Sequence, residues 1–347
     1  MNIRLNLTDS MFGSTETCLV TAGVFEIAAF RYASGVAALR IRNDRGEIIV
    51  LPYQGQQIWR ASFDDRDLTM KSMFAEPVPT RKYLENYGAF YLHCGLSAIG
   101  APGPDDTHEL HGELPNAPFR HAWLEISDER VALCGSYEHA VAFATHYRAT
   151  TRAALTAGSA LIDIGIGVDN LRRVPMALMY LGHANFRPVD DGELDYSAVC
   201  RPDTVRVRQT IPRHIVPPPE YADLIGRLAC EPSAHHRMHP GTLYDPEVVF
   251  DIDFEAAAGG LAYCRQIRPG GGMDYIEFNP AVFSHSIRWL SRTPDQDALG
   301  MALPSTTGGE GRNAELRRTR YVPLDGGANW SAAIRLGYLR DDEWLAR

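Results

Sequence analysis

The stretch Trp123-Leu124-Glu125-Ile126-Ser127, followed by Arg130-Val131-Ala132-Leu133-Cys134-Gly135-Ser136-Tyr137-Glu138, decides the fold. Both segments are rich in β-forming residues and lie close together in the chain, which favours two antiparallel neighbours. Val141 to Arg148 has the same character and is predicted to be a third strand. Three short strands in succession indicate a meander rather than a unit in which helices alternate with strands.

Alternation within the third segment predicts which side chains share a face. One face would carry Phe143, Thr145 and Tyr147, and the other would carry His146 beside two alanines. We therefore interpret His146 as a strand residue rather than a catalytic group.

The same pattern extends in both directions from this meander. A hairpin is predicted where Ala37–Asn43 alternates with period two and a glycine-containing turn leads into Ile48–Leu51. Tyr221–Ala229, which follows three prolines, is the best of the few helical candidates. The remaining predicted strands are Val24–Tyr32, Arg152–Thr156, Ser159–Asn170, Val174–Leu181, Val205–Thr210, Val248–Phe254 and Leu261–Ile267. Many strands and few helices predict one all-β domain over residues 1–347, built as a sandwich or a pair of large sheets.

Composition excludes several classes of protein. A net charge of −9 argues against nucleic-acid binding. The chain has no apolar run of about 18 residues and no apolar N-terminal segment, so we expect neither a membrane span nor a signal peptide. Six cysteines without a CxxC pair indicate free thiols in a reducing cytoplasm. With only Lys71 and Lys82 as lysines, neither in a distinctive setting, Schiff-base chemistry is not expected.

Candidate chemistry gathers in Pro104-Asp105-Asp106-Thr107-His108-Glu109-Leu110-His111-Gly112-Glu113-Leu114-Pro115. Proline and glycine make this segment a loop that presents its side chains. Imidazoles beside carboxylates suit proton transfer or metal binding. His111, pinned by flanking leucines, is the stronger functional candidate, and His108 is the weaker one. His183 lies at the end of a predicted buried strand, where sites are commonly built.

Other polar residues suit a hydroxyl-rich ligand. Gln57 and Arg60 flank Trp59, and Arg288 precedes Trp289, so amide and guanidinium groups stand beside rings that can stack on a sugar. Further candidate contacts are His93 beside Cys94, Asp253 on a strand with Asp251, Glu277 in an apolar run and Glu310 in a glycine-rich loop. The histidine-rich segment 214–240 is interpreted as a solvated surface excursion.

Taken together, these residues resemble the aldose 1-epimerase (galactose mutarotase-like) superfamily, in particular its branch of unassigned aldose-epimerase-like proteins. The motifs that carry the resemblance are Leu51–Trp59, Leu110–Pro118, Gly182–Phe186 and Asp245–Phe250. The resemblance implies a large antiparallel β-supersandwich and interconversion of sugar anomers, in which a base removes the C1 hydroxyl proton while an acid protonates the ring oxygen.

The resemblance also implies roles for single residues. His111 matches the histidine that polarises the sugar near its ring oxygen, His183 matches the general acid, and Asp253 resembles the carboxylate that binds sugar hydroxyls. The family base is a late glutamate, but the comparable stretch Leu299–Thr306 contains no carboxylate. Glu310 is the nearest replacement and Glu277 is the next.

The sequence thus predicts a cytoplasmic mutarotase that uses no metal or organic cofactor and binds a small sugar or sugar derivative. Two alternatives stay open. One is a carbohydrate-binding protein that has lost the base, and the other is a metal-dependent sugar isomerase using His108, His111 and a carboxylate. The sequence does not fix the oligomeric state, and a homodimer is one alternative.

Overall fold

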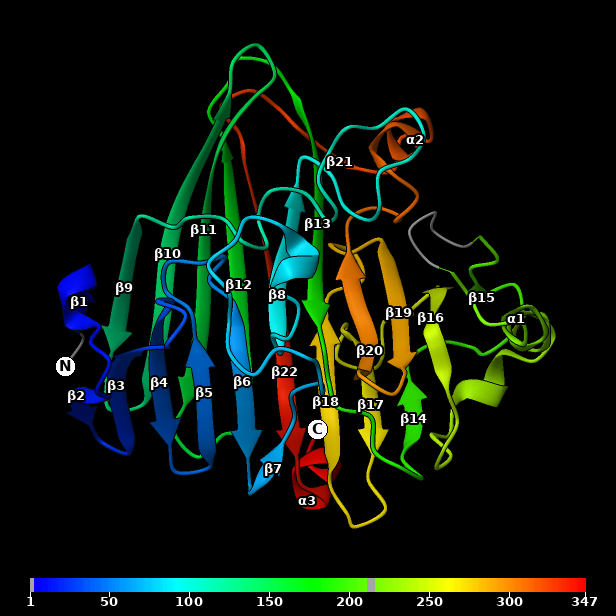
Figure 1. The fold of residues 1–347 in the computed structure, drawn as a ribbon, viewed down its shortest axis with the longest axis horizontal. Coiled ribbons are helices and arrows are strands. Elements are labelled where there is room, and N and C mark those ends of the chain that lie inside the picture. The colour runs from blue at the N-terminus through cyan, green and yellow to red at the C-terminus, as the bar shows by residue number, and fades with distance from the viewer. Residues whose placement is uncertain (1–2, 211–215) are drawn as a thin grey trace.

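The computed structural model describes residues 3–210 and 216–347, and they form two antiparallel β-sheets with few helices between the strands (Figure 1). One sheet has nine strands among the described residues. In spatial order these are β1 (Ile3–Asn6), β9 (His121–Ile126), β10 (Arg130–Val141), β11 (Thr145–Thr156), β12 (Leu161–Asn170), β22 (Asn329–Leu339), β18 (Met273–Phe278), β17 (Ala262–Ile267) and β14 (Glu193–Tyr196).

The other sheet has thirteen strands within the same described ranges. Eleven follow one path: β15 (Val205–Val207), β16 (Tyr244–Ile252), β19 (His285–Arg292), β20 (Asp297–Ser305), β13 (Met176–Ala184), β8 (Tyr91–Leu96), β6 (Ile58–Phe63), β5 (Gly46–Val50), β4 (Ala37–Asn43), β3 (Phe25–Arg31) and β2 (Thr17–Ala22). Off this path, β7 (Arg66–Asp67) pairs with β6 and β21 (Val322–Leu324) pairs with β13.

Helices are short and peripheral to the two sheets. The α-helices are α1 (Tyr221–Cys230), α2 (Arg312–Arg317) and α3 (Asp341–Leu345), and the 3₁₀ turns are η1 (Asp9–Met11), η2 (Tyr83–Glu85) and η3 (Pro232–His235). The predicted all-β class, the Ala37–Asn43 hairpin and the helix after the prolines are confirmed.

The core lies between the two sheets because alternating strand residues face it. In β9 the buried residues are Ala122, Leu124 and Ile126, while His121 and Glu125 are exposed. One large cluster of buried apolar side chains includes residues from both sheets, among them Leu39 of β4 and Ile164 of β12.

The third strand of the meander was placed wrongly at its start. β10 runs on to Val141, the chain turns, and β11 begins at Thr145. Phe143 lies at the tip of this hairpin with φ +66° and a fully exposed side chain, so it does not share a strand face with Tyr147. The apolar composition resembles a strand, but chain reversal requires a left-handed residue there. His146 is confirmed as a strand residue, and its Nε2 contacts Glu138 Oε1 at 2.9 Å.

The segment 214–240 is not wholly a solvated loop, although its first two residues lie outside the described ranges. The η3 turn, which begins at Pro232, directs His235 into the core, where its ring stacks on Phe250 with centroids 4.1 Å apart. His236 is half-buried and hydrogen bonds through Nε2 to the Tyr196 hydroxyl at 2.8 Å. Histidine and proline frequency alone could not show this burial.

The two faces of β13 determine where His183 points. Gly182 faces the nine-stranded sheet, since a Cβ there would lie 2.5 Å from Ile334 Cδ1 of β22. Successive strand residues point to opposite faces, so His183 and Leu181 project from the face turned away from that sheet.

Candidate functional site

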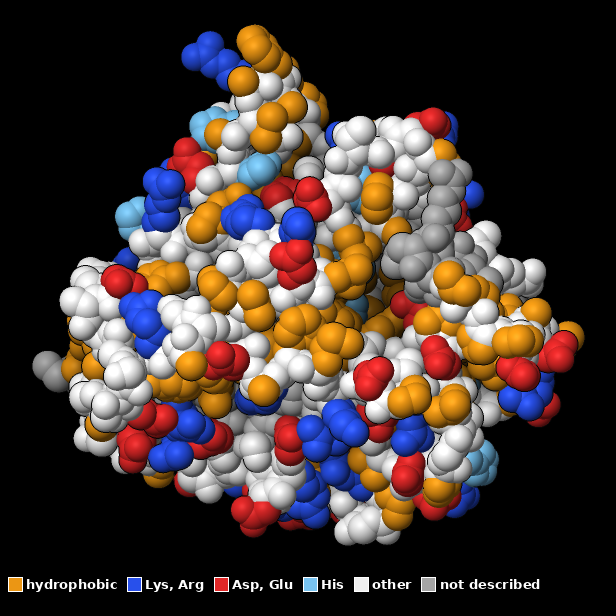
Figure 2. All heavy atoms as spheres, in the orientation of Figure 1, with side chains coloured by type: hydrophobic (Ala, Val, Ile, Leu, Met, Phe, Trp, Pro, Cys, Tyr) orange, Lys and Arg blue, Asp and Glu red, His pale blue; other side chains and the backbone are white. Residues whose placement is uncertain are grey.

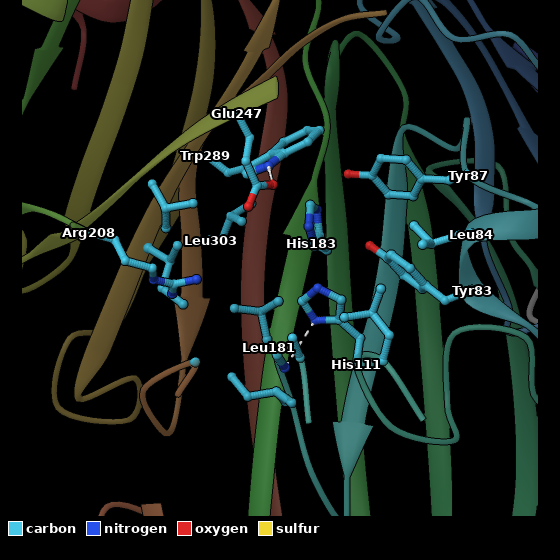
Figure 3. Close-up of a pocket in the computed structure, with 17 residues that line it drawn as sticks. Tyr83, Leu84, Tyr87, His111, Leu181, His183, Arg208, Glu247, Trp289 and Leu303 are labelled. Carbon is cyan, nitrogen blue, oxygen red and sulfur yellow. Dashed lines mark hydrogen bonds between the residues drawn. The ribbon is translucent and has the colours of Figure 1, made fainter. Parts of the chain in front are cut away.

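A pocket lies on this outer face of the thirteen-stranded sheet, where four of its strands contribute side chains. Figure 2 shows the surface hollowed near the middle of the view and bordered largely by hydrophobic side chains. Figure 3 shows the strand residues meeting a wall of loop residues across this space. The lining comprises Tyr83, Leu84, Tyr87, Ile99, Gly100, Ala101, Leu110, His111, Leu181, His183, Arg208, Glu247, Val249, Ile287, Trp289, Leu303 and Gly309.

The loop of residues 104–115 brings His111 to the pocket. As predicted, it contains turns but neither helix nor strand. His111 has φ +58°, its backbone N–H donates to Gly100 O at 3.1 Å, and its carbonyl accepts from Gly95 N at 2.9 Å. These bonds fix the backbone of His111 beside the end of β8 and place its ring in the pocket (Figure 3).

The carboxylates of this loop hold it in place rather than join the histidines in the pocket. Glu113 accepts hydrogen bonds from Ser97 N at 3.1 Å and from the Tyr147 hydroxyl at 2.5 Å. Asp106 accepts from Asn313 N at 2.9 Å. Histidines and carboxylates therefore cluster in this segment for two reasons. His111 faces the pocket, and the carboxylates accept hydrogen bonds that hold an irregular backbone in place.

A substitution at Gly112 tests how closely the histidine loop must pack against the backbone of Ala98. It has φ +76°, and a Cβ would lie 2.4 Å from Ala98 O, so Gly112→Ala combines backbone strain with a backbone clash. We expect it to lower the free energy of unfolding by about 2–4 kcal/mol and to displace His111. Urea unfolding and the chemical shift of the His111 ring would measure the two effects.

Gly35→Ala is the matched control for that substitution. Gly35 has φ +92° but no atom within 4 Å of an added Cβ, so it isolates the backbone strain. A loss of about 1 kcal/mol is expected there. Equal losses for both variants would show that the close approach to Ala98 does not constrain the loop.

The two predicted histidines meet in the pocket. The rings of His111 and His183 lie edge to face with centroids 5.4 Å apart. Burial lowers the pKa of His183 to about 4, and burial together with the charges of His183, Arg208 and His108 lowers the pKa of His111 well below its usual range. Both rings are therefore uncharged at neutral pH. His183 Nδ1 is buried and has no hydrogen-bond partner among the described residues.

Aromatic side chains enclose the histidines. Tyr83 packs on His111 with centroids 4.8 Å apart, and Tyr87 and Trp289 meet His183 edge to face at 5.9 and 5.6 Å. The Tyr83 hydroxyl is buried and has no partner within the described part of the chain. A flat apolar wall with unpaired polar atoms is the kind of surface that binds a sugar ring.

Glu247 and Arg208 are pocket residues that the sequence analysis missed. Glu247 begins the apolar run of β16, and its Oε2 accepts from Trp289 Nε1 at 2.7 Å. It carries the one carboxylate among the described residues that line this pocket. Arg208 extends into the pocket from just beyond β15 (Figure 3). Glu247 stood inside a motif used for the resemblance, and a carboxylate directly before the apolar run Val248–Phe250 was the signal that could have identified it.

The structure does not bring Gln57 and Arg60 into this pocket, and their donors are occupied elsewhere. Gln57 is buried and donates to Pro115 O at 2.7 Å. Arg60 donates to Gly88 O at 2.7 Å and to Phe74 O at 3.1 Å. Both side chains therefore brace the segments next to the pocket.

His93 and His108 also lie outside the pocket lining. His93 is buried on the core side of β8, where its Nδ1 hydrogen bonds to the Tyr180 hydroxyl at 2.8 Å and burial lowers its pKa to about 3. His108 turns its Nδ1 toward Glu109 O at 2.8 Å, and its Nε2 lies 3.8 Å from Asp106 Oδ2.

Arg288 and Glu277 belong to packing away from the pocket. Arg288 is fully buried, donating to Met301 O at 2.9 Å and contacting His235 Nε2 at 2.7 Å. Glu277 lies in the nine-stranded sheet, where its Oε2 accepts from the Tyr275 hydroxyl and from Arg347, both at 2.8 Å.

Glu310 and Asp253 line a separate cavity. Glu310 is about half exposed and forms an ion pair with Arg318. Asp253 forms a two-pronged ion pair with Arg206 at 2.6 and 2.7 Å. The structure thus gathers His111 and His183 from the predicted set and leaves Glu310 and Asp253 apart from them.

Across residues 3–210 and 216–347, no group of three or more His, Cys, Asp and Glu side chains is placed to hold a metal ion. In the same ranges, no helix has the length and hydrophobicity needed to cross a bilayer. All six cysteines are free, and burial raises the pKa of the Cys94 thiol beside His93 well above its usual range.

Comparison with solved structures identifies the fold. A protein from Klebsiella pneumoniae subsp. pneumoniae, provisionally named an aldose 1-epimerase, superposes with a TM-score of 0.79 at 18% identity over 99% of this chain and 89% of its own. A galactose mutarotase-like protein from Clostridium acetobutylicum gives 0.62 at 12% identity, covering 90% and 98%. A mutarotase, also provisionally named, from Salmonella typhimurium gives 0.61 at 9% identity, covering 94% and 97%.

Sequence comparison adds one family match. A family described as a domain of unknown function (DUF4432) matches residues 33–199, which include both pocket histidines. No curated protein matches the chain. The fold is therefore galactose mutarotase-like, and the resemblance read from the sequence is confirmed at the level of the fold.

Proposed function

We propose that this chain is a mutarotase that interconverts the anomers of a free sugar in the pocket of His111 and His183. One observation carries the proposal: two neutral imidazoles, one carboxylate and an aromatic wall converge in a single pocket of a galactose mutarotase-like fold. The names of the Klebsiella and Salmonella neighbours support the same class of reaction. Binding of a small sugar in the cytoplasm, and a homodimer as one alternative, remain predictions.

The proposed mechanism uses a proton donor and a proton acceptor on either side of the anomeric carbon. Glu247 takes the proton of the C1 hydroxyl, and its carboxylate is held in position by the Trp289 indole N–H. His183, which takes up a proton from solvent as the sugar binds, gives that proton to the ring oxygen, the ring opens, and rotation about C1–C2 precedes closure on the other face. Each proton then returns along the same route, as anomer exchange requires.

The uncharged state of His183 has a consequence for this mechanism. Burial lowers the pKa of His183 to about 4, so this pKa must rise once a sugar is bound for the ring to hold a proton at neutral pH. The carboxylate of Glu247, which faces the same space in Figure 3, would stabilise a charged imidazole after water has left the pocket. The pKa of His111 is also lowered well below its usual range, by burial and by the neighbouring charges of His183, Arg208 and His108, and we assign this ring to hydrogen bonding of the sugar rather than to proton transfer.

Anomer-exchange NMR on a panel of aldoses and uronic acids tests the proposal. We expect wild-type protein to accelerate exchange of at least one sugar and His183→Ala to reduce that acceleration about 10²-fold, because the ring oxygen loses its proton donor. His146→Ala, which removes a partly exposed histidine on β11, is the control and should retain full activity. Equal rates for wild type and His183→Ala would refute the assignment.

A carbohydrate-binding protein without catalysis is the second candidate. Leu303 of β20 lines the pocket within the stretch where the family resemblance calls for a glutamate base. In that case, sugar signals would broaden on addition of protein while exchange remained at its spontaneous rate.

A further inference from the structure

A second cavity adjoins the pocket, and Arg208 lines both. Apart from Arg208 and Val207, this second cavity is lined by polar and charged residues, which are Arg206, Gln209, Thr210, Asp251, Asp253, Ser284, His285, Glu310, Arg318 and Arg320. The Arg208 backbone N–H donates to Val249 O of β16 at 2.7 Å, which fixes the residue between the two spaces. The largely apolar pocket of His111 and His183 therefore adjoins an arginine-rich cavity at Arg208.

Charge pairing distinguishes Arg208 from Arg206 and Arg318, and burial distinguishes it from Arg320, which is also without an ion pair in the described ranges but is exposed. Arg206 is paired with Asp253 and Arg318 with Glu310. Arg208 forms neither an ion pair nor a side-chain hydrogen bond with any residue in the described ranges, although it is partly buried. The carboxylate of Glu247 in the same pocket bonds instead to Trp289.

An unpaired, partly buried guanidinium in an apolar pocket favours an anionic ligand group. Its planar fork of N–H donors matches a carboxylate or phosphate, and such charge-assisted bonds are stronger where water is scarce. Figure 3 shows Arg208 across the pocket from the tyrosine wall and directed toward the histidines. A sugar with its anomeric carbon at His183 would thus have its far end within reach of this arginine.

We infer that the ligand of this pocket is an anionic aldose, a uronic acid or a sugar phosphate, whose negative group is held by Arg208. The inference rests on the proposed function for the anomeric end of the sugar. The carboxylate and the phosphate share the chemistry that Arg208 recognises. The second cavity leaves room for the larger phosphate, with Arg320 as a further cation on its wall.

The test compares galactose, galacturonic acid and glucose 6-phosphate by anomer-exchange NMR, with binding followed by line broadening. We expect kcat/KM for one anionic sugar to exceed that for galactose by at least about 10-fold. In Arg208→Met the ratio of anionic to neutral kcat/KM should fall about 10- to 100-fold, mainly through KM, since one charge-assisted contact is lost. Arg208→Lys should recover part of the ratio, and melting curves would establish that both variants fold.

Arg148→Met is the matched control because Arg148 lies on β11 and pairs with Glu138, away from both cavities. It should leave the ratio unchanged. Preference for galacturonic acid or for glucose 6-phosphate would identify the anion as carboxylate or phosphate.

The outcomes separate this inference from the proposed function. Fast exchange of galactose with no effect of Arg208→Met on the ratio would overturn the inference and leave mutarotation standing. Arg208-dependent binding of an anionic sugar without faster exchange would support the inference and overturn mutarotation. No binding and no exchange with any of the three sugars would overturn both.

Discussion

Glu247→Gln is expected to reduce anomer exchange about 10³-fold while leaving sugar binding nearly unchanged. The amide is isosteric with the carboxylate, and its oxygen can still accept the hydrogen bond from Trp289 Nε1, so the geometry of the pocket should persist. The amide cannot take the C1 hydroxyl proton. General-base catalysis contributes about 10²- to 10⁴-fold, and no second carboxylate among the described lining residues can replace Glu247.

Glu310→Gln makes this experiment decisive between two candidate bases. The sequence placed the base at Glu310, whereas the structure pairs that residue with Arg318 in the second cavity. We expect Glu310→Gln to change exchange by less than about twofold, because removing an exposed ion pair perturbs little. Loss of exchange in Glu310→Gln but not in Glu247→Gln would return the base to Glu310. Glu109→Gln, on the exposed side of the histidine loop, serves as the inert control.

The strands could be predicted from the sequence because alternation is a local signal. β4 and β9 show it directly, and each side chain takes its face from its immediate neighbours along the chain. The start of β11 was misplaced because Ala142 to Ala144 has the composition of a strand but forms a turn. Backbone conformation at Phe143, rather than hydrophobicity, decides that boundary.

The pocket is lined by residues that lie far apart in the sequence, and this limited the prediction of the site. His111 and His183 were found because each stands in a distinctive local setting. Glu247 and Arg208 join them only because β15, β16, β19, β20 and β13 lie in that order in one sheet. That order follows from strand pairing across long stretches of chain, which residue spacing does not reveal.

Residue type also gave wrong predictions of sugar-binding residues where a polar side chain hydrogen bonds within the protein. Gln57, Arg60 and Arg288 carry groups suited to sugar hydroxyls, yet each donates to a backbone carbonyl within the protein. Buried donors must be satisfied, and irregular segments present many carbonyls that need a donor. A sequence shows the donor but not the carbonyl that it satisfies.

Acidification is expected to unfold this protein steeply as the pH falls below 6.5. Burial lowers the pKa of His93 to about 3 and of His183 to about 4, and it lowers the pKa values of His111 and His235 well below their usual range. In the unfolded chain these rings bind protons near pH 6.5, so between about pH 6.5 and 4 the unfolded state binds more protons than the folded state. Stability is therefore fully present above pH 6.5 and is lost as the pH falls through this window.

Burial also lowers the pKa of the half-buried His236 to about 4. Each histidine that stays uncharged in the folded protein costs about 2 kcal/mol by pH 5, so the five together approach the free energy of unfolding of a typical domain. The pKa of Asp64 is lowered to about 2, mainly by its hydrogen bond with Arg45. Its contribution to the free energy of unfolding is therefore lost only below about pH 4, outside the pH range in which the histidines act. Melting temperatures from pH 7.5 to 5 measure the effect. In His93→Gln the slope should be reduced by about a fifth, since one of five contributing histidines is removed. His146→Gln should retain the slope. A melting temperature that stays constant down to pH 5 would show that the buried histidines gain protons without unfolding.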